Sequence, residues 1–132
     1  MALTDSTEAE VLQYLFGRVY FAPPPVYYAA LSSTEINENG TGATEPSGGG
    51  YARVAIPNNA TNFVLSGGQI LNGTAIAFPT ATGPWSQQNY IAFFDQSTGG
   101  TVKMRGSLSP AQTIDTNQRL FFDPNDLSLS AS

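Results

Sequence analysis

The sequence predicts a mainly β protein: a single antiparallel β-sandwich, jelly-roll-like, preceded by a short N-terminal amphipathic helix. From residue 26 onward, short stretches rich in β-branched and aromatic residues are separated by turn residues about every eight to twelve positions, a spacing typical of sandwiches. Before residue 21, apolar residues instead recur at helical spacing. The chain has 132 residues and no cysteine. This is the length of one domain that can bury a core without disulfides.

The predicted helix lies within residues 1–20. Asp5, with Glu8 three residues later, resembles a capping box and predicts the start of the helix. Gly17 predicts its end. The helix would carry one apolar stripe, formed by Val11, Leu12, Leu15, Phe16 and Val19. A stripe of this kind packs either on a neighbouring protein or on its own domain, and an ordinary core helix is the simpler interpretation.

The first strand is predicted at residues 26–31, and an irregular segment lies on each side of it. Residues 21–25 contain three successive prolines, which fix φ and cannot donate ladder hydrogen bonds, so they predict a rigid extended connector. Residues 32–50 form a polar, glycine-rich loop. A loop of this length is expected to be functional or to become ordered on assembly. Its three glutamates, Glu35, Glu38 and Glu45, are therefore candidate interface residues.

The sandwich is predicted to span residues 26–132. Its further strands are expected near residues 51–56, 61–65, 74–78, 89–94, 101–106, 112–115, 119–122 and 127–129.

A central hairpin is the clearest part of this prediction. Residues 89–94 are apolar on both faces, as expected for a strand that is covered from both sides. The next strand is predicted to be half exposed. Strict alternation would place Val102 and Met104 on one face and Lys103 and Arg105 on the other.

Composition narrows the function. Only 11% of the residues are charged, compared with about 25% in typical soluble proteins. A surface this neutral favours coverage by further copies or by partners, although a Ser/Thr-rich β domain is the simpler alternative. The net charge is −5, and the five basic residues are scattered, so no nucleic-acid partner is expected. They are Arg18, Arg53, Lys103, Arg105 and Arg119.

Several kinds of chemistry are not expected. Without Cys or His the chain cannot form thiol nucleophiles, cysteine or histidine zinc sites, or serine-histidine triads. No apolar run reaches the length of a bilayer crossing, so no membrane partner is predicted. Carboxylate pairs could cleave glycans, but Asp95, Asp123 and Asp126 lie at predicted turns, where Asp is favoured for turn geometry alone. We therefore expect no enzymatic activity and no cofactor.

The 32–50 loop also contains candidate ligands for calcium. Asn37 and Asn39, with the neighbouring carboxylates, have oxygens suited to calcium. The loop lacks the full EF-hand pattern, so no metal site is predicted.

Four aromatic or basic residues are further interface candidates. Tyr51 and Arg53 share one predicted strand face after a glycine run that would allow close approach of a neighbour, and both residue types are enriched at interfaces. The alternative makes Tyr51 a lid over the core. Trp85 and Tyr90 could form a platform for sugars. The favoured alternative buries Trp85, with its indole N–H bonded to a loop carbonyl.

The order of these features resembles a family of small tailed-bacteriophage virion proteins, usually described as tail-fibre or tail-associated proteins. The resemblance covers nearly the whole chain and rests on the N-terminal helix and four motifs. These are VYYAALSS from Val26, ATEPSGGGYARVAI from Ala43, AFPTATGPW from Ala77 and FFDQSTGG from Phe93. The resemblance implies a structural role in the virion and no catalytic residues.

Two virion roles remain open. A cement or decoration protein would bind and stabilise the capsid surface, whereas a tail-fibre or tail-appendage protein would contribute to host binding. A fibre needs a shaft, and the chain shows neither repeats nor heptads, which favours cement. The family resemblance favours the tail. With cement as the first interpretation, we expect a virion protein assembled in the host cytoplasm. Its expected partners are itself, as a homotrimer, and the major capsid protein or tail components.

Overall fold

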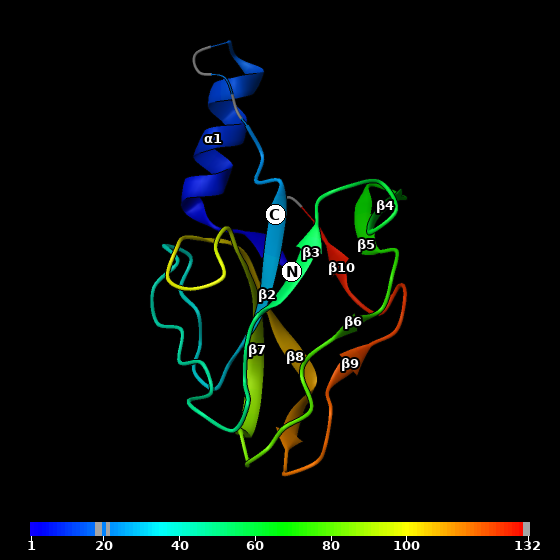
Figure 1. The fold of residues 1–132 in the computed structure, drawn as a ribbon. Coiled ribbons are helices and arrows are strands. Elements are labelled where there is room, and N and C mark those ends of the chain that lie inside the picture. The colour runs from blue at the N-terminus through cyan, green and yellow to red at the C-terminus, as the bar shows by residue number, and fades with distance from the viewer. Residues whose placement is uncertain (18–19, 21, 131–132) are drawn as a thin grey trace.

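The computed structural model describes residues 1–17, 20 and 22–130 (Figure 1). Three residues named in the sequence analysis lie outside the described residues. They are the basic residue Arg18, Val19 of the predicted helix stripe and Phe21 of the predicted connector. One helix and ten strands are found in the described part. They are β1 (Ala2–Leu3), α1 (Asp5–Leu15), β2 (Val26–Ser32), β3 (Val54–Pro57), β4 (Phe63–Ser66), β5 (Gln69–Asn72), β6 (Ile76–Ala77), β7 (Ser86–Phe94), β8 (Val102–Ile114), β9 (Phe121–Phe122) and β10 (Ser128–Leu129).

Three antiparallel sheets form the body of the protein. The largest has the strand order β1-β8-β7-β2-β3, and the two smaller sheets have the orders β10-β5-β4 and β6-β9. The main core combines buried side chains from all three sheets, including Phe93 of β7, Ile76 of β6 and Leu129 of β10. The large sheet therefore packs against the two small ones, and the predicted mainly β, antiparallel fold with an N-terminal helix is confirmed.

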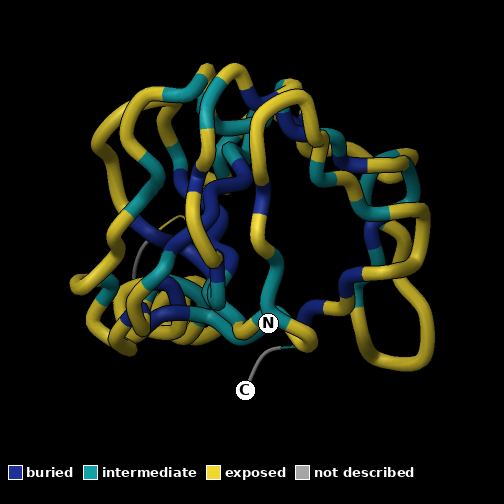
Figure 2. Tube along the Cα trace, turned by 90° about the horizontal axis from the view of Figure 1, so that it is seen from below, coloured by how far each residue is buried: buried dark blue, intermediate teal, exposed yellow. Residues whose placement is uncertain are grey.

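The other face of the large sheet is covered by the segment that follows β2. Ile36 of this segment is 1% exposed and packs on Ala92, Phe94 and Val102 in a second, smaller cluster. Strand β7 is thus covered on both faces, as predicted, and Ile91–Phe94 are all buried. Figure 2 shows the buried stretches of the chain gathered inside, with exposed loops around them.

Strand β8 differs from the sequence prediction in length and in register. The strands predicted at residues 101–106 and 112–115 are one strand. Phe94 pairs with Val102, but Phe93 pairs with Met104, so Lys103 is an extra residue in a β-bulge. Because the bulge shifts the alternation, Val102 joins the second cluster and Met104 joins the main core. The prediction that these two residues share a face is wrong.

Two strands were not predicted. Strand β5 follows β4 through a two-residue turn, Gly67-Gly68, whose φ values of 58° and 78° suit the tight turn of a hairpin. Strand β1 pairs with β8 at the edge of the large sheet. Next to it, the Ser130 N–H donates to the Met1 carbonyl at 3.0 Å, which joins this edge to the end of β10.

The helix begins at Asp5, the residue predicted as its cap, and its N-cap lies one residue earlier. Thr4 is the N-cap residue, and the prediction of Asp5 as a capping-box residue is wrong. The Thr4 hydroxyl does not cap the helix; it donates to the Val102 carbonyl at 2.7 Å, which anchors the helix start on β8. The predicted end is confirmed, since α1 stops at Leu15 and Gly17 adopts a φ of 69°.

Candidate interaction surfaces

The second half of α1 exposes an apolar surface. Leu15 is 67% exposed and Phe16 is 77% exposed, and the Tyr20 ring lies edge-to-face on Tyr14 at 6.2 Å between centroids. We call the exposed set the apolar helix end: Leu12, Tyr14, Leu15, Phe16 and Tyr20. Thr7 is the one buried residue of α1. The interpretation of α1 as an ordinary core helix is therefore wrong.

This exposure arises because α1 is attached to the sheet at its start. The Asp5 N–H donates to the Glu38 carbonyl at 2.9 Å, next to the Thr4 anchor on β8. One turn further, Lys103 Nζ lies 3.1 Å from Glu10 Oε1. Beyond this point the helix projects past the end of the sheets (Figure 1). Its apolar stripe therefore has no sheet to pack on.

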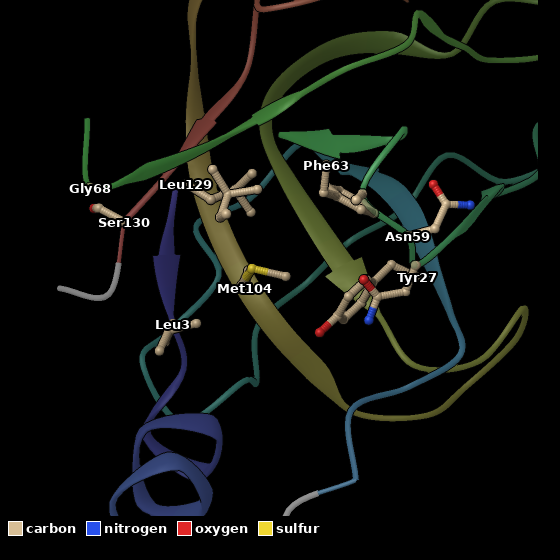
Figure 3. Close-up of a pocket in the computed structure, with 11 residues that line it drawn as sticks. Leu3, Tyr27, Asn59, Phe63, Gly68, Met104, Leu129 and Ser130 are labelled. Carbon is tan, nitrogen blue, oxygen red and sulfur yellow. The ribbon is translucent and has the colours of Figure 1, made fainter. Parts of the chain in front are cut away.

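An apolar groove of about 570 Å³ opens between the large sheet and the β10-β5-β4 sheet (Figure 3). Its walls are core residues reached from outside: Leu3, Tyr27, Phe63, Ile70, Met104 and Leu129. Asn58, Asn59, Ala60, Gly68 and Ser130 form its rim. None of these residues is Asp, Glu, Lys or Arg. Burial, and secondarily the charge of Glu10, raises the pKa of Tyr27, so the groove is neutral at pH 7.

The predicted pair Tyr51 and Arg53 meets at Glu45. Arg53 donates to the Glu45 carboxylate from Nε at 2.9 Å and from Nη2 at 2.7 Å, and the Tyr51 hydroxyl donates to it at 2.7 Å. Arg53 Nη1 also donates to the carbonyls of Gln96 and Gly99. The guanidinium lies 3.6 Å from the Phe94 ring centroid. These contacts join three segments within one chain.

The electrostatics of this cluster favour its ionised form. Burial alone would raise the pKa of Glu45, but hydrogen bonds from Arg53 and Tyr51 and the charge of Arg53 hold it below its ordinary value. Burial raises the pKa of Tyr51, whose hydroxyl also accepts the Leu31 N–H. The Tyr51 ring stacks on Phe78. Tyr51 therefore lies where the alternative interpretation placed it, as a lid on the core.

Trp85 is part of the core. It is 3% exposed, and its Nε1–H donates to the Gly49 carbonyl at 2.8 Å, as the favoured interpretation predicted. A Cβ atom at Gly49 would lie 2.8 Å from the Gly83 carbonyl oxygen, so the glycine run permits close approach within the chain. Tyr90 is half-buried beside the second cluster. These two residues do not form an exposed platform.

The 32–50 loop is held by its own hydrogen bonds. The buried Ser32 hydroxyl accepts the Thr44 N–H at 2.9 Å and donates to the Thr34 carbonyl at 2.7 Å. Asn37 and Asn39 both bond Thr41 through their side-chain amides. These bonds hold the loop in a defined conformation within one chain, and its ordering on assembly stays a prediction.

The remaining acidic residues have mainly local roles. Glu35 is exposed, and Glu38 lies 3.4 Å from Arg105 Nη2. Asp95 accepts the Thr101 N–H and Asp126 accepts the Asp123 N–H, which confirms the predicted turn roles. In the part of the chain that the structure covers, no group of three or more His, Cys, Asp or Glu could hold a metal ion. No described helix is long and apolar enough to cross a membrane.

Sequence reasoning found the apolar stripe of α1 but not the groove. The groove walls come from six strands between β1 and β10, of which only β4 and β5 are consecutive elements, so no local pattern brings them together. The one local sign is the sequence of β4, Phe63-Val64-Leu65, which places apolar residues on both faces of the strand.

Comparison with protein families gives one match, over residues 2–130, to the Gp80 family model, described as podophage GP4 fiber I protein gp80. No curated protein matches the chain. The match includes α1 and all three sheets, and it supports the tail-fibre interpretation better than the capsid-cement one. The chain therefore belongs to the Gp80 family of phage fibre proteins and is a component of a tailed-phage virion.

Proposed function

We propose that the protein is a non-enzymatic structural subunit of a tail fibre, which assembles with copies of itself and with other tail proteins and contributes to host binding. The family match over nearly the whole chain carries this proposal. The sequence shows neither the repeats nor the heptads of a fibre shaft, which favours a role as an adaptor or a tip within the fibre. Assembly takes place in the host cytoplasm.

The apolar helix end supports a role in assembly. Exposed apolar residues that gather in one place mark interaction sites, because leaving them in water costs free energy. A low charge content of 11% agrees with a surface that partners cover. We propose a homotrimer as the assembled form, because a three-fold ring gives every copy the same contacts and leaves none open.

The roles of the carboxylates support a structural rather than a catalytic protein. Glu45 and Glu10 pair with Arg53 and Lys103, and the turn aspartates bond backbone N–H groups. The scattered basic residues form no stripe for nucleic acid. Protein surfaces of the virion are therefore the proposed partners, in place of nucleic acid or membrane.

Peptide mass spectrometry of separated heads and tails tests the location. A tail-fibre subunit is expected in the tail fraction, and phage that lack it should adsorb poorly to the host while their heads remain stable. Recovery in the head fraction, with heads that burst more readily on heating when the protein is missing, would instead support the cement role.

A further inference from the structure

We propose that the apolar helix end of one copy inserts into the apolar groove of a second copy, and that this contact repeats around a closed ring. The inference rests on the self-assembly part of the proposed function and names the two surfaces involved. A helix that lays its apolar side chains into a preformed groove is a common mode of protein recognition.

Both surfaces expose apolar side chains whose burial away from water would be favourable. The five residues of the apolar helix end are between 51% and 80% exposed. The groove leaves Phe63 and Met104 of the main core accessible from outside. Its volume of about 570 Å³ lies within the range that holds drug-sized molecules, so it can admit several side chains.

Strand β4 extends the groove wall outward. Leu65 pairs with Ile70, which lines the groove, and cross-strand partners point to the same face of a sheet. Leu65 is 74% exposed. Its side chain therefore adds apolar surface at the groove entrance, where an incoming helix would first make contact.

The charges of the two surfaces are compatible. The described residues of the apolar helix end and of the groove include no Asp, Glu, Lys or Arg, although the chain carries a net charge of −5. Arg18, which lies between Phe16 and Tyr20 in sequence, is outside the described residues. The carboxylates of α1, Asp5, Glu8 and Glu10, lie in its first two turns, away from the exposed end. Insertion would therefore bury no unpaired charge, which would oppose binding.

The areas favour helix-in-groove contact over helix-on-helix contact. An aromatic ring can bury about 150 to 250 Å², so a partly exposed set with three rings offers on the order of 500 Å² per copy. Stable interfaces use about 800 Å² per partner. In a head-to-tail ring each copy makes two such contacts, one through its helix end and one through its groove, so it buries about twice the apolar area of a single helix-on-helix contact.

A copy cannot fill its own groove. Thr4 and the Glu10–Lys103 ion pair fix the direction of α1, and Figure 3 shows the helix leaving the groove region beyond Leu3. The exposed end lies farther along the helix and is carried away from the groove. A contact between unlike surfaces of identical chains can then close into a ring.

Mixing two variants tests this contact in solution. Leu15→Ser with Phe16→Ser removes the helix contact, and Leu65→Glu places a charge at the groove entrance. All three side chains are exposed, so both variants should fold with the circular dichroism spectrum of wild type, since surface changes rarely cost more than about 0.5 kcal/mol. Phe121→Glu, at an exposed residue outside both surfaces, is the matched control.

By light scattering, we expect wild type and the Phe121→Glu control to be oligomers and each of the other two variants to be a monomer. Mixed at equal concentration, the helix variant and the groove variant should form a one-to-one heterodimer, because one intact groove then meets one intact helix end. A mixture that stays monomeric would overturn the proposal.

Two other results would also overturn it. If the groove variant assembles like wild type, helix ends contact one another and the groove is not used. The proposed self-assembly would then stand, but the helix-in-groove contact would not. A monomeric wild-type protein at high concentration would reject both the contact and the proposed self-assembly. The location of the protein in heads or tails is measured separately on virions, so failure here leaves the tail-fibre assignment open to its own test.

Discussion

At the scale of single residues, Trp85 stabilises the fold through packing and one hydrogen bond. Trp85→Ala removes a side chain that contacts Tyr51 edge-to-face at 5.3 Å between centroids and donates to Gly49. Loss of a buried aromatic side chain costs about 3 to 5 kcal/mol. We therefore expect the melting temperature to fall by roughly 10 °C or more. Calorimetry or circular dichroism would measure it.

Trp85→Phe is the matched control for this change. It retains an aromatic ring but loses the indole N–H, so a smaller loss, of about 1 kcal/mol for the hydrogen bond, is expected in addition to imperfect packing. If Trp85→Ala melts within about 2 °C of wild type, Trp85 does not carry the packing assigned to it.

The Glu45 carboxylate makes stability depend on acid pH. Its pKa in the folded protein lies below the ordinary value of 4.5. Its stabilising contribution is thus fully present above about pH 4.5 and is lost as the pH falls through the lowered value. Glu45→Gln should cost about 1 to 3 kcal/mol at pH 7, because charged hydrogen bonds to Arg53 are lost. The variant should also be less sensitive to acid than wild type.

Urea unfolding between pH 7 and pH 3 measures this effect. Glu35→Gln is the control, because Glu35 lies in the same loop with its side chain exposed. The assignment fails if the free energies of unfolding of wild type and Glu45→Gln keep a constant difference over the whole pH range.

At the scale of elements, the 32–50 loop depends on one buried hydroxyl. Ser32→Ala would leave the Thr44 N–H without the acceptor it now has at 2.9 Å. Loss of this part-buried hydrogen bond should cost about 1 kcal/mol, and most of this cost should appear as local opening of the loop. A glutamate-specific protease, which has three sites in this loop, should cut the variant faster than wild type.

Ser33→Ala is the control for that experiment. Its hydroxyl makes only an exposed contact of 3.4 Å to the Thr44 carbonyl. Cleavage of wild type as fast as Ser32→Ala would show that the loop is open in the free protein.

Local patterns predicted those elements whose environment is set by neighbours in the sequence. Residues 89–94 are apolar on both faces, and β7 is covered on both faces. Strand β1 was missed because Ala2-Leu3 comes directly before the helix signal, and β5 because its sequence QILN does not alternate apolar and polar residues. The bulge at Lys103 was missed because it depends on pairing with β7, which a single strand does not encode.

Candidate sites followed the same rule. Tyr51 and Arg53 are two residues apart, so the sequence predicted that they share an environment. Their common partner Glu45 lies in the preceding loop, and the sequence did not predict this pairing. The stripe of α1 was also found. Whether a stripe faces its own core is decided by where the helix is anchored, and Thr4 achieves this through β8, about 100 residues away in sequence.

At the scale of the whole molecule, the proposed ring predicts an unusual response to salt. Each copy carries a net charge of −5, so copies repel one another at low ionic strength. Salt screens this repulsion over a distance of about 10 Å at 0.1 M. The two contact surfaces hold no ion pair that salt could weaken. Raising NaCl from about 50 to 500 mM should therefore tighten assembly and lower the apparent dissociation constant.

Sedimentation velocity at fixed protein concentration and three salt concentrations measures this response. The Leu65→Glu variant is the control: it should remain monomeric at every salt concentration, because screening cannot restore the apolar wall beside Ile70. Interfaces held by surface ion pairs behave in the opposite way and loosen as salt is added. Dissociation of the wild-type oligomer at 500 mM NaCl would therefore mean that charged residues outside the helix end and groove hold the copies together.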